Sequence, residues 1–183
     1  MGERTHIFEK QFSDFLGDKT NCAAVSNCTA ALHMSLLAFD VGVGDEVIIP
    51  SLTFVADVNV VKLVGATPVL ADANSMSDWN MSLDAIEKKI TTRTKAVIIV
   101  HYAGYPCCSI EAISELCKER GIALIEDVAH APGASINGKS CGTFGDIGCF
   151  SFFSNKNLSI GEGGLICARD TDLFKKLCFL RSH

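Results

Sequence analysis

The chain has 183 residues, of which 48% are hydrophobic and 20% charged, and its formal net charge is −5. This length suits one domain, and the apolar content excludes a disordered chain, which could not bury enough surface to offset its ordering entropy. The mild acidity gives no electrostatic reason to expect nucleic acid or a membrane surface as partner. Because the apolar runs are short and the N-terminus leads into a charged helical pattern, we expect a cytoplasmic protein.

The cysteine pattern points to reduced thiols. The chain has nine Cys, an odd number, and two of them, Cys107 and Cys108, are adjacent. Both facts fit poorly with a disulfide framework, so we expect several of these thiols to be buried as small hydrophobic groups. The sequence contains no Cys-x-x-Cys and no ligand spacing among its five His, so we expect no metal site.

In the first half of the chain, helical and strand patterns alternate. Phenylalanines at helical spacing predict a helix at Thr5–Leu16, which Gly17 ends. The elements predicted next are a strand at Cys22–Ser26, a helix at Thr29–Phe39, and strands at Glu46–Ile49, before Pro50, and Thr67–Ala71. Thr53–Val64 is apolar on nearly every side, so a buried helix and a strand both remain open.

The second half continues the alternation. We predict a helix at Leu83–Ile90 capped by Ser82, a strand at Lys95–Val100, a helix at Ser109–Arg120, strands at Ile122–Glu126, Ile147–Phe153 and Leu165–Ala168, and a helix at Thr171–Ser182. Together the elements predict an α/β fold: a three-layer αβα sandwich with a mostly parallel central sheet. Such sheets bind ligands at the carboxyl ends of their strands. The last helix reaches the final residue without a stop signal, so we expect a chain cut from something longer.

Three places that follow predicted strands carry candidate chemistry. At Ser26–Ala31 a strand leads into a helix start, whose free amides attract an anion, with the Thr29 hydroxyl beside them. Asp127 follows an apolar strand and needs a partner for its charge, and His130 lies three residues later. The alternatives remain ordinary helix caps at the first two places and a structural histidine.

The third place is the segment from Ser151 to Gly164. Lys156 has aromatic, small and Gly neighbours rather than other charges, and such a setting favours a neutral, nucleophilic amine. Ser151 lies five residues earlier and could bind an anion, while Gly161, Gly163 and Gly164 allow close backbone approach. A surface lysine is the alternative. An anion site, a carboxylate and a lysine in one α/β sheet are what pyridoxal 5'-phosphate (PLP) requires.

Five motifs occur in order along the chain: Thr-Ala-Ala-Leu-His (29–33), Gly-Asp-Glu-Val-Ile-Ile-Pro-Ser-Leu-Thr-Phe (44–54), Gly-Ala-Thr-Pro-Val (65–69), Glu-Asp-Val-Ala-His (126–130) and Ser-Phe-Phe-Ser-Asn-Lys-Asn-Leu-Ser-Ile-Gly-Glu-Gly-Gly (151–164). With them the chain resembles the DegT/StrS (DnrJ/EryC) group of PLP-dependent sugar aminotransferases. The resemblance implies fold type I, a homodimer, and transfer of an amino group, usually from glutamate, to a nucleotide-linked keto-sugar in amino-sugar and cell-surface polysaccharide biosynthesis.

The resemblance also implies residue roles. Lys156 would bond covalently to the cofactor and move protons at the substrate carbon. The cofactor would further be held by Asp127 at its pyridine nitrogen, by Thr29, Ala30 and Ser151 at its phosphate, by Phe54 stacked on its ring, and by His130 beside the ring. Core packing is the alternative for Phe54.

Compared with that group, the chain lacks the first segment and everything after His183, including the C-terminal small domain. Residues 1–183 would then be a partial PLP-binding large domain. Two other interpretations stay open: an inactive or partner-binding fragment of such an enzyme, and another fold type I PLP reaction.

Overall fold

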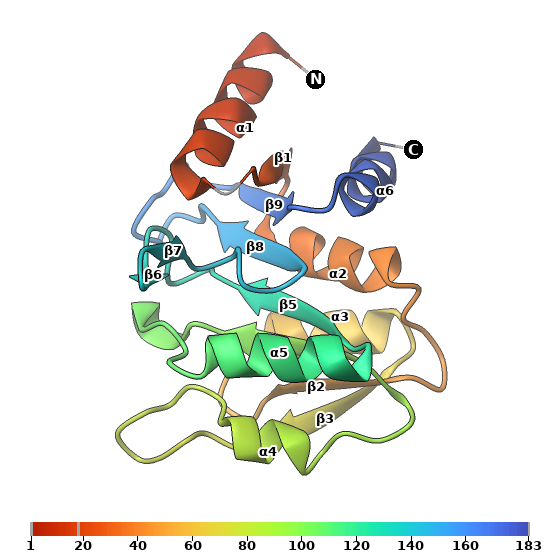
Figure 1. The fold of residues 1–183 in the computed structure, drawn as a ribbon. Helices are drawn as coiled ribbons and strands as arrows, with labels where there is room; N and C mark the ends of the chain where they lie inside the picture. Colours follow the sequence, from red (N-terminus) through yellow and green to blue (C-terminus); the bar gives the residue numbers. More distant parts are fainter. Residues whose placement is uncertain (1, 18, 183) are drawn as a thin grey trace.

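The central sheet is mostly parallel, as predicted. The computed structural model describes residues 2–17 and 19–182. Within these residues seven strands form one sheet in the order β1-β9-β8-β5-β4-β2-β3 (Figure 1). The strands are β1 Asn21–Val25, β2 Glu46–Pro50, β3 Thr67–Ala71, β4 Thr94–Val100, β5 Ala123–Asp127, β8 Ile147–Ser151 and β9 Gly164–Ala168. The pairs from β3 across to β8 are parallel, whereas β9 is antiparallel to both β8 and β1.

Helices cover both faces of the sheet, which gives the predicted three layers. They are α1 Glu3–Leu16, α2 Cys28–Ala38, α3 Val55–Leu63, α4 Leu83–Glu87, α5 Ile110–Arg120 and α6 Thr171–Ser182. In Figure 1, α4 and α5 lie on one face, and α2, α3 and α6 lie on the other. Within the described residues, no helix is long and apolar enough to cross a membrane.

Side chains that alternate between the two faces of each strand divide the core between the two helical layers. Val47 and Ile49 of β2 belong to the cluster of buried residues formed with α2, α3 and α6. Ile48, between them, belongs to the cluster formed with α4 and α5. This division follows because successive side chains of a strand point to opposite faces. A sheet buried on both faces therefore needs the continuous apolar runs seen in the sequence.

The two terminal helices fix the β1 edge of the sheet. Phe12 of α1 packs edge-to-face against Phe150 and Phe152, with ring centroids 5.1 and 5.6 Å apart. Glu9 of α1 accepts hydrogen bonds from Arg181 Nη1 of α6 at 2.6 Å and from the Ala24 amide of β1 at 2.9 Å. This shared, mostly buried carboxylate joins α1, α6 and β1, segments from both ends of the chain.

Several predicted boundaries need correction. Thr53–Val64 contains helix α3, which begins after the N-cap Phe54, so the strand alternative is wrong. The helix predicted to reach Ile90 ends at Glu87, although Ser82 caps it as expected through a hydrogen bond from the Ala85 amide. The strand predicted to end at Glu126 includes Asp127 as its last residue. The strand predicted to reach Phe153 ends at Ser151.

The remaining boundaries agree within two residues, with Thr67–Ala71 and Thr171–Ser182 exact at both ends, whereas a 3-10 turn and a two-stranded hairpin were missed. The 3-10 turn η1, Tyr102–Gly104, follows β4. A hairpin joins β6, Ser135–Ile136, to β7, Lys139–Ser140. Its turn residues, Asn137 and Gly138, both have positive φ, of 52° and 79°. Asn-Gly is the pair that such two-residue turns favour, so this hairpin had a readable signal in the sequence.

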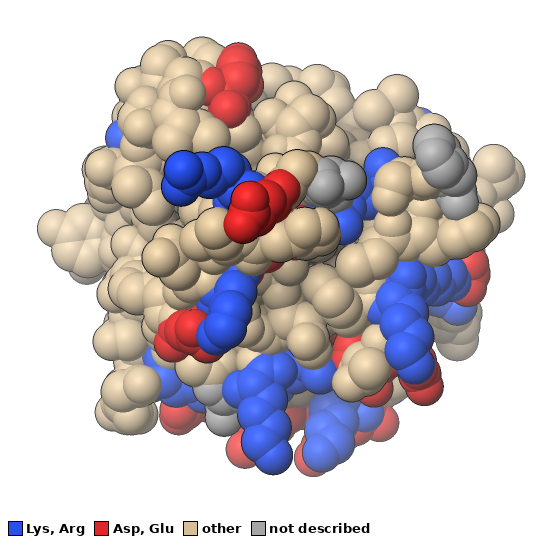
Figure 2. Space-filling model, turned by 90° about the horizontal axis from the view of Figure 1, so that it is seen from above, with Lys and Arg blue, Asp and Glu red and all other residues tan. Residues whose placement is uncertain are grey.

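Charges of both signs alternate on the surface. On the face seen in Figure 2, Lys and Arg side chains lie beside Asp and Glu, and a large part of the face is uncharged. The exposed ion pairs of the structure include Lys10 with Asp14 and Lys176 with Asp40. The distribution on this face agrees with the mild net charge and forms no strong field of a single sign.

Candidate active site

A cavity of about 440 Å³ opens at the carboxyl ends of the central strands. Its wall includes the last residues of β4, β5 and β8, which are Val100, Asp127 and Ser151. The first turn of α2, the start of α3, the segments after β4 and β5, and the loop after β8 also line it. Six of the seven residues predicted from the sequence line this cavity: Thr29, Phe54, Asp127, His130, Ser151 and Lys156. The seventh, Ala30, is not among the described lining residues. The structure therefore brings the six residues, which lie up to 127 positions apart in the sequence (Thr29 to Lys156), into one hollow of ligand size.

Asp127 is a buried carboxylate at this cavity, only 4% exposed. Its Oδ1 accepts a hydrogen bond from the Ala129 amide at 2.8 Å and one from the Cys28 thiol at 3.7 Å. Burial raises the pKa of Asp127, and the Ala129 amide, His130 and Lys156 counteract that rise. A carboxylate with so few partners favours a cationic group that enters the cavity.

The start of α2 provides amide donors. Asn27 caps the helix by accepting a hydrogen bond from the Ala30 amide at 2.9 Å, so the cap interpretation is correct for that amide. The amides of Cys28 and Thr29 have no acceptor among the described residues, and Thr29 faces the cavity. The anion-binding expectation thus shifts from Ala30 to the first two residues of the helix.

Gly164 allows this helix start to lie against the sheet. A Cβ at Gly164 would overlap the backbone of Asn27 and Cys28. Gly163 is also close-packed, against Ile160. Gly161 differs from the expectation: it has open space around it and a φ of +92°, so it serves the turn of the loop rather than a close approach.

Lys156 lies in the loop that follows β8. The loop turns back through a hydrogen bond from the Lys156 amide to the Phe153 carbonyl at 2.9 Å. Lys156 is half-buried and lines both the main cavity and a smaller hollow of about 220 Å³ beside His130. The lysine is therefore part of the cavity wall, which argues against the alternative of a purely surface position.

The aromatic rings of Phe54 and His130 lie at different depths in the cavity. Phe54, the N-cap residue of α3, is 67% exposed and forms part of the rim, which argues against the core-packing alternative. His130 is half-buried, and its Nδ1 accepts a hydrogen bond from the Ala103 amide at 3.3 Å. Burial, assisted by the nearby Lys156, lowers the pKa of His130. His130 is therefore mainly neutral near pH 7 and can accept or donate a hydrogen bond.

Sequence reasoning missed three residues at this site. Tyr102 lines the cavity from η1, and its ring lies 6.0 Å from the ring of His130. Cys28 faces Asp127, and Glu162 lines the cavity beside Lys156. Tyr102 follows the strand β4 by two residues, so its placement after a strand was the available signal.

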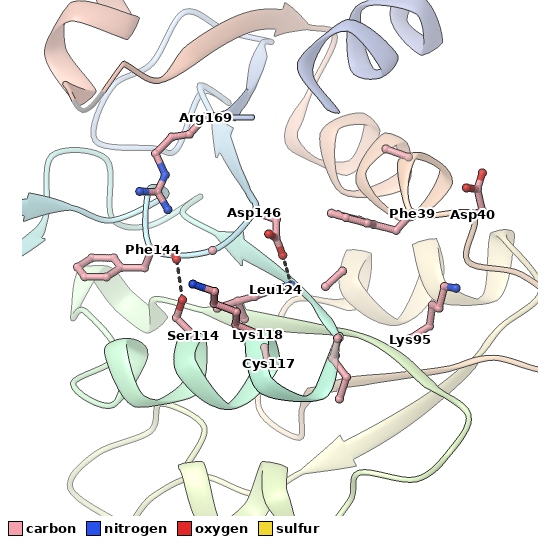
Figure 3. Close-up of a pocket in the computed structure, with 15 residues that line it drawn as sticks. Phe39, Asp40, Lys95, Ser114, Cys117, Lys118, Leu124, Phe144, Asp146 and Arg169 are labelled. Atoms are coloured by element: carbon pink, nitrogen blue, oxygen red, sulfur yellow. Dashed lines mark hydrogen bonds between the residues drawn. The ribbon is translucent and has the colours of Figure 1, made fainter. Parts of the chain in front are cut away.

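A larger hollow of about 650 Å³ lies at the opposite edge, among the amino ends of the strands (Figure 3). Its polar groups are largely engaged with the protein. The Ser114 hydroxyl donates to the Phe144 carbonyl at 2.9 Å, and Asp146 accepts from the Leu124 amide at 2.8 Å. Ligands of open α/β sheets bind at the other edge, so size alone does not make this hollow the functional site.

The cavity at the carboxyl edge fits PLP. The partly unsatisfied carboxylate of Asp127 suits a protonated ring nitrogen, and the amides of Cys28 and Thr29 with the Ser151 hydroxyl suit a phosphate. Lys156 supplies a primary amine on the same wall. Together these groups can hold a molecule with an anionic end, a basic ring nitrogen and an aldehyde.

Comparison with known proteins agrees with this assignment. Residues 1–183 match the sequence profile of the DegT/DnrJ/EryC1/StrS aminotransferases, which is the whole of the chain. The chain belongs to the DegT/DnrJ/EryC1/StrS aminotransferase family. This is a family of PLP-dependent sugar aminotransferases. The resemblance deduced from the five motifs is thereby confirmed.

Characterised relatives are about twice as long. The chain is 46% identical over 175 residues to GDP-perosamine synthase of Escherichia coli O157:H7, and the match covers 96% of the chain and 47% of that protein. It is 47% identical over 184 residues to the UDP-N-acetyl-3-dehydro-alpha-D-glucosamine 3-aminotransferase of Acidithiobacillus ferrooxidans, covering all of the chain and 49% of that protein. The chain thus spans about half the length of these relatives.

Solved structures of the family share the fold. The crystal structure of DesV from S. venezuelae superposes with a TM-score of 0.93 at 34% identity, covering 100% of this chain and 48% of that one. The aminotransferase of Psychrobacter cryohalolentis gives a TM-score of 0.91 at 36% identity, covering 97% and 44%. The seven-stranded sheet is therefore the large-domain sheet of these aminotransferases, and the predicted fold class is confirmed.

Proposed function

We propose that this protein transfers an amino group, with PLP as cofactor, from glutamate to the keto group of a nucleotide-linked sugar. The reaction would serve amino-sugar and cell-surface polysaccharide biosynthesis in the cytoplasm. The observation that carries the proposal is the presence of Lys156 and Asp127 on the wall of one 440 Å³ cavity, with Ser151 and the α2 amides beside them. Residues 1–183 would form the cofactor-binding part of the large domain, and the complete enzyme would be a homodimer.

Each residue of the cavity has a defined task in this proposal. Asp127 holds a proton on the ring nitrogen of the cofactor, which bound PLP requires to draw electrons from the carbon beside the transferred amine. Ser151 and the amides of Cys28 and Thr29 fix the phosphate and so orient the ring. Phe54 covers the ring from the rim. His130, uncharged near neutral pH, contributes a hydrogen bond beside the ring.

Lys156 has two tasks. Its amine would hold the cofactor at the aldehyde end, and it would accept and return the proton at the substrate carbon that bears the amine. Some members of this group carry His where the others carry this lysine, and they remove a hydroxyl group instead. An imidazole can move a proton but cannot form the covalent bond to the aldehyde. Lys156 therefore favours amino transfer over dehydration.

The substrate class is supported by the names of relatives. Besides the GDP- and UDP-sugar enzymes above, a protein of Saccharopolyspora spinosa named dTDP-4-dehydro-2,3,6-trideoxy-D-glucose 4-aminotransferase is 40% identical over all of the chain. These names share a sugar on a nucleoside diphosphate but differ in base and amination position. We therefore propose the class, a nucleotide-linked keto-sugar, without choosing the base.

The half length of the chain supports a second candidate: a fragment that binds PLP or a partner without completing the reaction. One experiment separates the two. The protein expressed from its complete reading frame is mixed with PLP and glutamate, and release of 2-oxoglutarate is measured. Stoichiometric release that becomes catalytic when GDP-, UDP- or dTDP-linked keto-sugars are added supports the aminotransferase. If the native protein binds PLP but releases no 2-oxoglutarate, and Lys156→Ala binds PLP equally well, the result supports the fragment.

A further inference from the structure

A second acidic residue, Asp57, is buried near the cofactor cavity without lining it. Asp57 belongs to the first turn of α3, and its side chain is fully buried. Its Oδ2 accepts a hydrogen bond from the Thr53 hydroxyl. Its Oδ1 has no hydrogen-bond partner among the described residues. Asp57 is also absent from the described residues that line the cavity. Ionising a carboxyl group that is buried with so few hydrogen-bond partners is costly, so its protonation state has to be explained.

None of the described groups that interact electrostatically with Asp57 is positively charged. Asp127 at the end of β5, Cys28 of α2 and Cys149 of β8 are close enough to interact with it electrostatically. The Ser35 hydroxyl lies 3.3 Å from the sulfur of Cys149. Strand β2 also packs against α3, and it contributes the apolar Val47 and Ile49 to the shared core. Its one acidic residue, Glu46, is paired with Arg93 at the strand's other end.

The positive groups of the site act on the other carboxyl. Burial raises the pKa of Asp127 as well, but the Ala129 amide, His130, Lys156 and the Cys28 thiol counteract this rise. For Asp57 only the Thr53 hydroxyl acts in that direction, while burial and the charge of Asp127 raise its pKa well above the ordinary value. Two buried carboxylates that interact electrostatically cannot both ionise cheaply, so a single proton belongs on the one with fewer stabilising partners, which is Asp57 with one hydroxyl donor and an Oδ1 unpartnered among the described residues.

We propose that Asp57 and Asp127, both buried, act as an electrostatically interacting pair (the dyad) that carries a single proton at neutral pH, held on Asp57. Asp57 is then a positioning residue: its neutral carboxyl keeps the one negative charge of the pair on Asp127, at the cavity wall. The consequence for the ring nitrogen of PLP rests on the proposed function, whereas the proton on Asp57 does not.

Carboxyl NMR tests the protonation state directly, without cofactor. The complete protein is labelled with ¹³C at the aspartate side-chain carboxyl and titrated. We expect one resonance at the chemical shift of a protonated carboxyl at pH 7, and we expect Asp57→Asn to remove it. If the resonance lost in Asp57→Asn instead titrates in the ordinary aspartate range, near pH 4, the proposal is wrong.

Thermal unfolding gives an independent readout. A carboxyl whose pKa is raised on folding contributes stability below its unfolded pKa, and that contribution is lost as pH rises toward its folded pKa. The melting temperature of Asp57→Asn, relative to the native protein, should therefore rise by about 3–5 °C for each pH unit above about pH 4. Asp14→Asn, a change at an exposed residue paired only with Lys10, should give a nearly flat difference. A flat difference for Asp57→Asn contradicts the dyad.

Cofactor binding separates this inference from the function. At pH 7 Asp57→Asn should bind PLP within about twofold of the native protein, because the amide replaces an acid that is already neutral. If PLP fails to bind even the native protein while the NMR result holds, the proposed function fails and the dyad stands. If PLP binds the native protein but Asp57→Asn loses binding tenfold or more, Asp57 acts as a charge and the dyad proposal fails.

Discussion

Glu126 and Asp127 are neighbours at the end of β5, yet their carboxylates serve opposite faces of the sheet. Glu126 accepts hydrogen bonds from the Gly142 amide at 2.7 Å and the Gly145 amide at 2.6 Å, and it lies 2.9 Å from His101 Nε2. Asp127 faces α2 and the cofactor cavity. The strand alternation thus gives one acid a structural task and leaves the next one for chemistry.

Replacing Glu126 with Gln should destabilise the fold by about 2–4 kcal/mol. His101 Nδ1 accepts a hydrogen bond from the Cys107 amide, so Nε2 carries the proton and points at the carboxylate. In Glu126→Gln the side-chain NH2 group would face one of the three donors, the Gly142 amide, the Gly145 amide or His101 Nε2, and that hydrogen bond would be lost. Denaturant unfolding measures the loss, and Glu115→Gln, at an exposed position of α5, is the matched control. Equal midpoints for the two variants would contradict the assignment.

Asp127→Asn should affect binding and stability in opposite directions. The amide cannot stabilise a positive ring nitrogen, so PLP affinity should fall by about 100- to 1,000-fold. Burial raises the pKa of Asp127 in the folded protein, so without cofactor the native protein loses stability as the pH rises above about 4. The variant should therefore unfold at an equal or higher temperature at pH 7. PLP titration and thermal unfolding check the two effects. Unchanged affinity would exclude Asp127 as the partner of the ring nitrogen.

The adjacent thiols of Cys107 and Cys108 should differ sharply in reactivity. Burial raises the pKa of Cys107 to about 11, whereas Cys108 is exposed. With iodoacetamide at pH 7.5, Cys108 should be alkylated about 100-fold faster than Cys107, as read by mass spectrometry of the peptide that holds both. Equal labelling at early times would show that the segment opens readily.

The isolated 183-residue chain should associate in solution. Large apolar side chains are exposed at the cavity rim and beyond it, among them Phe54 at 67%, Ile160 at 67% and Phe179 at 69%. Exposed apolar surface of this kind favours contact between copies or with further chain. Light scattering at working concentration is the test, and a monodisperse monomer would contradict the prediction.

The arrangement of the sheet was predictable because its strands are buried on both sides. A run such as Ala96–Val100 has no polar residue, so the strand β4 was found almost to the residue. Gly17 marked the end of α1 correctly, whereas Pro50, predicted to lie beyond the strand, is the last residue of β2. The end of β5 was placed one residue too early because the charge of Asp127 resembles the start of a loop, whereas Asp127 is the last residue of the strand.

The candidate site was predictable in its members but less so in its contacts. Asp127 and Ser151 end their strands and Lys156 follows one, and strand ends meet at one edge of a parallel sheet. The occupied amide of Ala30 depends on the rotamer of Asn27, which no spacing reveals. Asp57 was overlooked because a single acid in an apolar helix resembles a surface residue, and only tertiary packing shows that it is fully buried.

Covalent trapping at Lys156 tests the central claim most directly. The complete protein is incubated with PLP, reduced with borohydride, digested and analysed by mass spectrometry. The account predicts one phosphopyridoxyl group, on Lys156 in the peptide after β8, and its loss in Lys156→Ala while Lys139→Ala remains labelled. A reduced adduct on another lysine, or equal labelling of Lys156→Ala, would contradict the assignment of Lys156 and the function built on it.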